Sequence, residues 1–532
     1  MRAGILPYER ITPIDCLTRN CIGGNSGNLL FQNSMTKALS TKGTEIIPNR
    51  YQVDLNDADW INQECSAFVL PMADAFRPSF VKELRELTEL VKRLTIPCIV
   101  TGVGLSASYE PDFSRPFSFD QDVKNFVNAV LEKSTMLGLR GEFTAEYLTK
   151  LGYKPEQDFT VIGCPSFYTN GAHMKLRELN LNQDTKVSLN TILYPQANLE
   201  NFIARTSDSY KNHYFVGQEK MELRLLYSGC DFRASSLYPC NTVDSDYYQQ
   251  QRARFFINVP TWLDFMKTMD ISVGPRMHGN VASLIADTPT ILFAIDSRTR
   301  ELMQYHKVPG MAAKDITENM TLEELVEKVD FRAIEVQHQQ NFNHFVDFLD
   351  KNGLENIYST PQDKDYYQEK MNSIELYPEI KPILQHTNET FENGVRVSYD
   401  WLLDHYYTFS ANYYLYSKWM DAKIKGKSTL DYFKEKGYQK IAIYGIHDIA
   451  HKLYEEIKDD PSVEIAYFID PKDGQVFHDL SVKSLESCDT SHVDAIIVTN
   501  VSAFKEIKDK FKEKDKVISI REMIDVISNA KL

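Results

Sequence analysis

Short apolar runs alternate with amphipathic stretches along most of the chain. The first part contains apolar runs at 67–71, 98–101 and 137–140, and stretches with helical spacing of apolar residues lie between them at 82–94 and 122–133. Buried parallel strands have this short, continuous apolar pattern, and the helices that connect them have one apolar face. The alternation therefore predicts a mostly parallel sheet with helices on both faces.

The same alternation restarts near residue 180 and again near residue 437. Apolar runs at 187–194 and 290–295 belong to the second series, and runs at 440–444 and 465–469 open the third. Residues 360–435 are polar and aromatic and contain no strand signals. A chain of 532 residues is too long for a single core. We predict an α/β protein with a Rossmann-like N-terminal lobe (1–180), a second α/β lobe (181–355), a helical connector (356–436) and a small Rossmann-like C-terminal domain (437–532).

Charge and cysteine usage narrow the functional classes. The chain has 59 basic and 74 acidic residues and a formal net charge of −15. This balance argues against a nucleic-acid partner, because surfaces that bind nucleic acid cluster Lys and Arg. No apolar run reaches the roughly 18 residues of a membrane helix, and the N-terminus lacks the apolar core of a signal peptide. The 8 cysteines contain no CxxC pair, so we expect a cytoplasmic protein without a disulfide framework or zinc site.

The stretch 270–296 carries the densest polar chemistry. An apolar run ends at Gly274, Arg276 and His278 follow, and a small-residue helix begins near Val281. Ligands of open α/β sheets bind at the carboxyl ends of strands, and helix starts attract anions. Arg is a permanent planar cation, and His can transfer a proton near neutral pH. We therefore predict both as catalytic residues; a local salt bridge for the arginine and a buried structural role for the histidine stay open.

Glycine-rich turns and further charged residues lie at other predicted strand ends. Gly102 and Gly104 form a Gly-x-Gly turn, and the loop 23–28 precedes a helix. Glycines let backbone amides approach a ligand closely. Arg140 is a further candidate cation for binding substrate, and a local salt bridge is the alternative role for it. Asp296 is also a candidate for binding substrate, and capping of the next helix is the alternative role for it. The remaining residues that we predict to bind substrate are Asn25, Gly27, Asn28, Gly279, Asn280 and Arg298.

Four motifs follow one another in a fixed order: GGNSGNLLF, TGVG, GLRGEFTAEYLTKLGY and PRMHGNVASLIADTPTILFAIDSRTREL. Their order and spacing resemble those of the polysaccharide pyruvyl transferases, over residues from about 15 to 350. The last motif is similar to the family's R-x-H, small-residue helix, Gly-x-Pro and Asp-x-Lys series. Three positions differ from the family pattern: Cys164 replaces an Asp before Pro165, Thr288 replaces a Gly, and Ser297-Arg298 replaces a Lys-containing segment.

This resemblance implies two lobes arranged as in GT-B glycosyltransferases. It also implies transfer of the enolpyruvyl carbons of phosphoenolpyruvate to two hydroxyls of one sugar, which forms a cyclic pyruvate ketal. Arg276 would bind phosphate or carboxylate, His278 would transfer a proton or bind phosphate, and Arg140 would support the anion. The Gly- and Asn-rich loop would face the acceptor. Phosphoenolpyruvate is then a co-substrate, and no cofactor or metal is required, because arginines and dipoles can stabilise the leaving phosphate.

The resemblance also defines the expected partners. They are phosphoenolpyruvate and a sugar or lipid-linked oligosaccharide of a bacterial surface polysaccharide. Peripheral association with the inner face of the membrane and formation of a homo-oligomer stay open. The aromatic run 406–416 is one candidate contact surface, with packing against a neighbouring domain as the alternative. Two rival functions also stay open: a GT-B-type glycosyltransferase that uses a nucleotide sugar, and a non-catalytic partner protein in polysaccharide biosynthesis.

The C-terminal segment lies outside this resemblance. Its strand–Gly445–helix–strand–Asp470 order is Rossmann-like, but the turn lacks the later glycines of a dinucleotide fingerprint. His447 and His451 have the H-x-x-x-H spacing of a metalloprotease, yet no third ligand is evident, so we interpret this spacing as coincidence. Nucleotide binding and a role in assembly both stay open.

Overall fold

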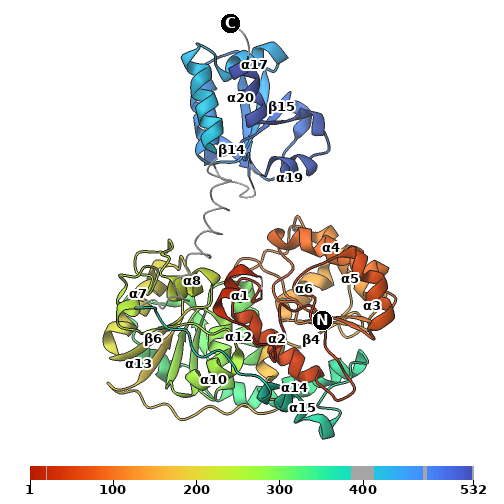
Figure 1. Ribbon diagram of the computed structural model, residues 1–532, viewed down its shortest axis with the longest axis vertical. Helices are drawn as coiled ribbons and strands as arrows, with labels where there is room; N and C mark the ends of the chain where they lie inside the picture. Colours follow the sequence, from red (N-terminus) through yellow and green to blue (C-terminus); the bar gives the residue numbers. More distant parts are fainter. Residues whose placement is uncertain (20, 385–411, 471–475, 502, 530–532) are drawn as a thin grey trace. The chain divides into compact units, whose positions relative to one another are not determined.

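The computed structural model describes residues 1–19, 21–384, 412–470, 476–501 and 503–529 (Figure 1). The chain divides into two compact units, Met1–Val397 and Ser398–Leu532. The larger unit contains two α/β lobes, and the smaller one contains a single sheet. The predicted α/β class with Rossmann-like lobes is confirmed.

The first lobe is built on two pairs of parallel strands. β1 (Phe68–Pro71) pairs with β2 (Cys98–Thr101), and β3 (Leu137–Leu139) pairs with β4 (Phe159–Val161). An isolated parallel bridge between the segment after β2 and β3 links the pairs. The strands are buried at nearly every position, as their continuous apolar runs predict. The helices of this lobe are α3 (Ala58–Glu64), α4 (Val81–Arg93), α5 (Asp120–Leu131) and α6 (Glu142–Lys150).

The second lobe contains a six-stranded parallel sheet in the order β10-β9-β8-β5-β6-β7. The strands are β5 (Lys186–Leu189), β6 (Asn212–Val216), β7 (Ala253–Arg254), β8 (Ile271–Gly274), β9 (Thr290–Ala294) and β10 (Gly310–Ala312). Its helices are α7 (Ala197–Ser209), α8 (Lys220–Ser228), α9 (Asp246–Gln249), α10 (Val259–Lys267), α11 (Met277–Ile285) and α13 (Leu322–Lys328). Successive strands joined by helices give this sheet its parallel order.

Four further helices pack where the lobes meet: α1 (Pro13–Thr18), α2 (Gly27–Leu39), α12 (Ser297–His306) and α14 (Ala333–Lys351). α2 contacts both β1 of the first lobe and α11 of the second, and its side chains are buried in the core that contains the large sheet. The backbone N–H of Ala107 donates to Ser297 Oγ at the start of α12 (3.0 Å), and Thr160 Oγ1 lies 2.8 Å from His344 Nε2 of α14. A later helix, α15 (Tyr366–Asn372), places Tyr367 within hydrogen-bond distance of Asn33 (2.5 Å).

The smaller unit has a second six-stranded sheet, in the order β13-β14-β12-β11-β15-β16. All neighbours are parallel except β13 and β14, which form an antiparallel hairpin. The strands are β11 (Lys440–Tyr444), β12 (Glu464–Ile469), β13 (Val476–Phe477), β14 (Leu480–Lys483), β15 (Ala495–Val498) and β16 (Val517–Ser519). The helices are α17 (Thr429–Lys436), α18 (Asp448–Ile457), α19 (Phe504–Asp509) and α20 (Ile520–Asn529).

The described part of the aromatic run lies on a helix of this smaller unit. Residues 412–424 are helical, and Leu415 and Trp419 are buried in the core formed with α18 and α20. The hydroxyls of Tyr414 and Tyr416 donate to Asp525 and Asp448 (3.1 and 2.6 Å). These tyrosines therefore contact their own unit. Of the other aromatic residues of the run, Tyr413 is 67% exposed, and Tyr406, Tyr407 and Phe409 lie outside the described residues.

Several element boundaries differ from the sequence expectation for local reasons. The segment 252–260, whose apolar residues alone do not separate strand from helix, contains the short strand β7 and the start of α10, because Asn258 caps the helix and Pro260 occupies its first turn. The short strands β10, β14 and β16 were not predicted, since three or four residues are too few to show a period. None of the helices in the described part of the chain has the length and apolar character needed to cross a bilayer.

Candidate functional site

The residues that follow the strands of both lobes meet at one site. Arg276 follows β8, Arg140 follows β3, and Cys164 comes shortly after β4. Parallel strands end at a common edge, so polar residues after them gather there. Arg140 Nη2 lies 3.9 Å from Cys164 Sγ, and the same sulfur lies 3.9 Å from His278 Nε2. The two lobes thus place a cation, a thiol and an imidazole side by side.

His278 occupies the second position of α11 and faces the start of α2. A Cβ atom on Gly27 would lie 2.7 Å from His278 Nδ1 and 2.8 Å from its Cβ, so the first turn of α2 packs directly against the imidazole. Burial lowers the pKa of His278 to about 3, and the positive charges of Arg140 and Arg298 contribute to the shift. The imidazole is therefore neutral at physiological pH in the free protein.

Arg276 is held by groups at the ends of β5 and β6. Its backbone N–H donates to Asn190 Oδ1 (2.7 Å), its Nε donates to the carbonyl of Thr191 (2.8 Å), and its guanidinium pairs with Glu219. Asn25 Nδ2 of the Gly- and Asn-rich loop donates to the same carboxylate (3.0 Å). Burial opposes the charge, but the neighbouring carboxylates, Glu219 first, raise the pKa of Arg276. Arg276 is thus charged, and its partner Glu219 also binds Asn25 of the Gly- and Asn-rich loop.

Arg140 differs from Arg276 and Arg298, which both form ion pairs with acidic side chains. Its exposed fraction is 2%, and its guanidinium carbon lies 5.9 Å from the ring centroid of Phe31. Among the described residues it makes no ion pair within 4 Å, and its buried Nε has no hydrogen-bond partner. A buried charge without a partner costs several kcal/mol. This position is therefore suited to an anion supplied from outside the chain.

Arg298 and Asp296 are engaged with each other and with the first lobe. Arg298 Nη1 donates to Asp74 of the first lobe (2.8 Å), and its Nη2 donates to Asp296 (3.1 Å). Asp296 Oδ1 also accepts the backbone N–H of Thr299 (2.8 Å) and so caps α12. Burial opposes ionisation of Asp74, but its arginine neighbours, Arg298 first and then Arg77, hold its pKa at about 2. The alternative that we left open for Asp296, helix capping, is present in the structure.

Asn280 and Gly279 belong to the buried frame that orients α11. Asn280 Nδ2 donates to the carbonyl of Gly274 (2.8 Å), and its Oδ1 accepts from the hydroxyls of Ser272 and Thr290 (3.0 and 2.7 Å). A Cβ on Gly279 would lie 2.7 Å from the Gln218 side chain. These contacts tie the start of α11 to β8 and β9, which fixes the position of the imidazole two residues earlier.

The predicted glycine turn after β2 brings the backbone close to Arg140. Gly102 has φ +66°, and a Cβ there would lie 2.9 Å from Pro165. A Cβ on Gly104 would lie 3.1 Å from Arg140 Cδ and 3.1 Å from Glu301 Oε1. Gly102 thus suits its positive φ and its close packing against Pro165, and Gly104 lies tightly against the aliphatic part of the Arg140 side chain.

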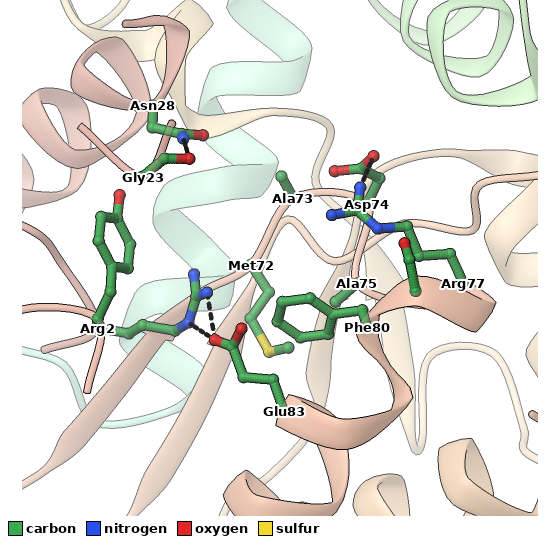
Figure 2. A pocket seen from close by; sticks show the side chains of 12 residues that line it. Arg2, Gly23, Asn28, Met72, Ala73, Asp74, Ala75, Arg77, Phe80 and Glu83 are labelled. Carbon is green, nitrogen blue, oxygen red and sulfur yellow. Dashed lines mark hydrogen bonds and ion pairs between the residues drawn. The ribbon is translucent and has the colours of Figure 1, made fainter. Parts of the chain in front are cut away.

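A cavity of about 340 Å³ lies in the first lobe beside this site (Figure 2). Asn28 lines it and donates to the carbonyl of Ile22 (3.0 Å). Figure 2 shows Arg2 turned towards Glu83, with Nη2 2.6 Å from the carboxylate, and Arg77 paired with Asp74. Asp74 both lines the cavity and binds Arg298, so the cavity adjoins the site. Its remaining lining residues are Gly23, Tyr51, Met72, Ala73, Ala75, Ser79 and Phe80.

The structure adds three acidic residues that the sequence analysis did not select. Asp74 comes three residues after β1 and Glu219 three residues after β6, so position at a strand end was a usable signal. Glu301 lies on α12 and is 1% exposed; it accepts from the backbone N–H and hydroxyl of Thr144 (3.1 Å each). Burial raises the pKa of Glu301 to about 8. Its sequence context, a charged helix, contains no signal of burial.

The sequence of this region matches a known family. Residues 66–297 match the family model described as polysaccharide pyruvyl transferase, which confirms the predicted resemblance over these residues and identifies a transferase. The match includes Arg140, Cys164, Arg276, His278 and Asp296 and excludes the smaller unit. No curated protein matches the chain significantly.

Similar solved structures are all distant. MnaA of S. aureus in complex with UDP is 12% identical, with 66% of this chain and 96% of that chain covered and a TM-score of 0.35. A putative UDP-N-acetylglucosamine 2-epimerase from Listeria monocytogenes is 8% identical, with 63% and 84% covered and a TM-score of 0.31. The wall teichoic acid polymerase TagF is 15% identical, with 62% and 78% covered and a TM-score of 0.27. At these scores the similarities support no statement about function.

Substitution Gly27→Ala tests the contact between α2 and the imidazole. The new Cβ would overlap His278 atoms at 2.7 and 2.8 Å, so we expect a loss of about 1–3 kcal/mol in the free energy of unfolding. Gly43→Ala is the matched control, because its Cβ would meet only Glu355 oxygens at 3.6 and 3.7 Å. Urea denaturation measures both. Equal stability of the two variants would show that His278 does not pack against α2.

Substitution Glu301→Gln tests the buried carboxylic acid. Because burial raises the pKa of Glu301 from 4.5 to about 8, the unfolded chain ionises first. The stability that Glu301 contributes is therefore complete below pH 4.5 and is lost as pH rises towards 8, by up to about 1.4 kcal/mol per pH unit. The Glu301→Gln variant lacks this loss of stability. The control variant Glu327→Gln, which changes an exposed side chain, retains it. Urea midpoints from pH 5 to 8 that fall in parallel for all three proteins would contradict the assignment.

Proposed function

We propose that the chain is a pyruvyl transferase that uses phosphoenolpyruvate to form a cyclic pyruvate ketal on a sugar of a bacterial surface polysaccharide or of its precursor. The family match supports the broader statement, a transferase that modifies polysaccharide. The observation that carries the choice of donor is the buried guanidinium of Arg140, which has no acidic partner among the described residues.

The charges of the site suit a small molecule with two anionic groups. Phosphoenolpyruvate carries a phosphate and a carboxylate. Arg140 offers an unpaired guanidinium to one of them, and Arg guanidinium groups bind both kinds of anion through paired N–H donors. Arg276 supplies a second positive charge, for which the substrate competes with Glu219. The first turns of α2 and α11 meet at His278 and add backbone N–H groups that favour anions.

The neutral imidazole defines the direction of proton transfer. In the proposed reaction one sugar hydroxyl attacks C2 of phosphoenolpyruvate while C3 gains a proton, and the second hydroxyl then forms a C2–O bond as the bond from C2 to the phosphate oxygen breaks. The two hydroxyl protons balance those gained by C3 and by the departing phosphate. His278 is neutral in the free protein, with a pKa of about 3. A bound anionic donor offsets the arginine charges that help to lower this pKa, so in the complex the imidazole takes the proton of the hydroxyl.

The cavity beside the site suits the acceptor. It combines the charged groups of Arg2 and Glu83 with the rings of Tyr51 and Phe80, and it lies next to Asp74. Sugar hydroxyls need such hydrogen-bonding groups, and sugar C–H faces pack against aromatic rings. Asn28 lines this cavity from the Gly- and Asn-rich loop, in agreement with the role that the family resemblance implies for the loop.

Substitution Arg140→Met separates the donor hypotheses. Methionine fills similar space without a charge, so we expect the fold to keep or gain stability and the affinity for phosphoenolpyruvate to fall at least about 100-fold, near 3 kcal/mol. Isothermal titration calorimetry measures this without knowledge of the acceptor. Arg85→Met removes an exposed arginine paired with Asp122 and serves as the control.

Other results of the same titration would contradict the proposal. A wild-type protein that binds a nucleotide sugar and not phosphoenolpyruvate would support the glycosyltransferase alternative. Binding of neither ligand would support a non-catalytic partner protein. Equal affinity of the wild type and Arg140→Met for phosphoenolpyruvate would remove Arg140 from the site.

The protonation state of His278 provides a further prediction. Histidine-selective NMR of the free protein should show an imidazole that remains neutral between pH 8 and pH 5, since its pKa lies at about 3; a His278→Gln variant assigns the signal. We expect this variant to release phosphate from phosphoenolpyruvate about 10²–10⁴-fold more slowly in the presence of acceptor. A His278 signal that titrates near pH 6.5, or wild-type turnover of the variant, would refute this role.

A further inference from the structure

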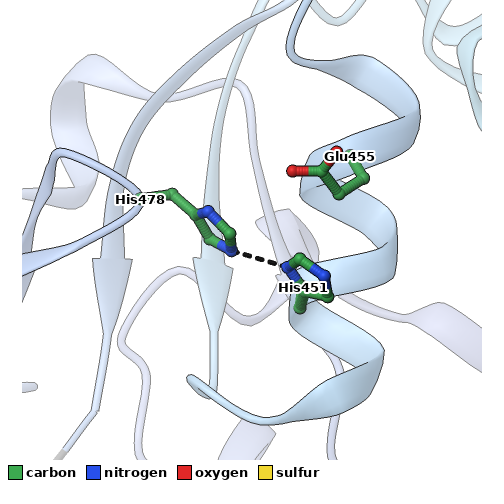
Figure 3. A group of neighbouring side chains, drawn as sticks. All are labelled: His451, Glu455 and His478. Atoms are coloured by element: carbon green, nitrogen blue, oxygen red, sulfur yellow. Dashed lines mark hydrogen bonds between the residues drawn. The ribbon is translucent and has the colours of Figure 1, made fainter.

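A second group of ionisable side chains lies in the smaller unit, outside the family match. His451 and Glu455 lie one turn apart on α18, and His478 lies in the turn between β13 and β14 (Figure 3). Each offers one ligand atom within 4.8 Å of those of the other two. Residues i and i+4 share a helix face, so the helix supplies two donors and the hairpin a third.

The two imidazoles face each other through their ring nitrogens. His451 Nδ1 and His478 Nε2 are 2.7 Å apart, and the ring planes differ by 9°. A neutral imidazole has one N–H and one bare nitrogen, so one of the two nitrogens donates to the other. Zinc–nitrogen bonds of about 2.0–2.1 Å in a tetrahedron would place these nitrogens about 3.3 Å apart. An opening of less than about 1 Å between the two imidazoles therefore gives the separation that zinc needs, and the Glu455 ligand atom lies within 4.8 Å of both.

His478 is held in place by an unusual backbone and by aromatic contacts. His478 and Asp479 have φ values of +50° and +62° and form the two-residue loop of the hairpin between Phe477 and Leu480. Positive φ at both positions is the conformation that two-residue hairpin loops favour, although it costs energy for residues other than glycine. The imidazole stacks on Tyr454 (4.2 Å between centroids, 13°) and meets Phe477 edge to face (4.5 Å, 77°).

The third donor is available without breaking the local ion pair. One Glu455 oxygen accepts from Lys458 Nζ (2.8 Å), and a carboxylate has a second oxygen for a ligand. In Figure 3 the carboxylate extends from the same side of α18 as His451, towards His478. The spacing of His447 and His451 is not the relevant one, because His447 Nε2 lies by Thr499 Oγ1 (3.2 Å). The histidine that faces His451 is His478, which lies 27 positions later in the sequence.

We propose that His451, Glu455 and His478 bind a divalent transition-metal ion, zinc in preference to magnesium or calcium. Imidazole is a zinc ligand, whereas magnesium and calcium select oxygen ligands. Three protein donors leave a fourth position for water or for a ligand. Bound there, the ion ties the β13–β14 hairpin to α18. This site is independent of the reaction proposed for the larger unit.

Zinc titration of the full-length chain tests the site. The protein is prepared without a polyhistidine tag, stripped with a chelator and titrated with zinc chloride in a calorimeter. We expect one ion per chain, with the affinity at least about 10-fold weaker in His451→Gln and in His478→Asn, where asparagine tolerates the positive φ. Cobalt(II) should give the visible absorption of tetrahedral coordination in the wild type and not in these variants. His492→Gln is the matched control, because it removes an 80% exposed histidine of the same unit.

Two further measurements keep the test decisive if a histidine variant folds poorly. Glu455→Gln changes an exposed side chain and should weaken zinc binding without a change in the circular dichroism spectrum. Zinc should also slow hydrogen exchange of the β13–β14 hairpin in the wild type. Absence of saturable zinc binding to the wild type, or the same affinity in the wild type, His451→Gln and Glu455→Gln, would show that the two histidines only hydrogen-bond each other and would overturn the proposal.

Discussion

The buried positive charge of Arg140 is the constraint on which the site depends. The residue is 2% exposed and makes no ion pair among the described residues, and its charge affects Asp74, His278 and Glu301. It contributes to the low pKa values of Asp74 and His278, so the carboxylate stays ionised and the imidazole stays neutral. The same imbalance that destabilises the empty site favours an anion within it.

The other charged residues of the site join segments that are distant in the sequence. Arg298 at the start of α12 binds Asp74 of the first lobe, and Glu219 at the end of β6 receives both Arg276 and Asn25. These interactions hold the two lobes and the N-terminal loop around His278. Their charges are already engaged in the folded chain, which explains why an arginine count alone does not identify the anion-binding residue. Exposed ion pairs contribute little to stability, but these partly buried ones fix the relative positions of the segments that they join.

The smaller unit shows a different use of histidine. In the larger unit His278 is surrounded by arginines, which disfavours both protonation and a metal cation. In the smaller unit His451 and His478 face each other, with a carboxylate nearby and aromatic rings behind. Electrostatic surroundings thus separate an imidazole suited to an anionic substrate from a pair suited to a cation. The two units carry their chemistry independently.

The sequence by itself determined the α/β class, the alternation of strands and helices and the segment that carries Arg276 and His278, because hydrophobic period and strand-end position are local properties. It did not distinguish the three arginines, since Arg140, Arg276 and Arg298 differ only in whether Glu219, Asp74 and Asp296 reach them in the fold. The sequence also did not indicate His478 as the partner of His451, because a hairpin brings these two residues together from positions 27 residues apart. Pairing of charges and convergence of ligands depend on long-range contacts, and these only the tertiary structure decided.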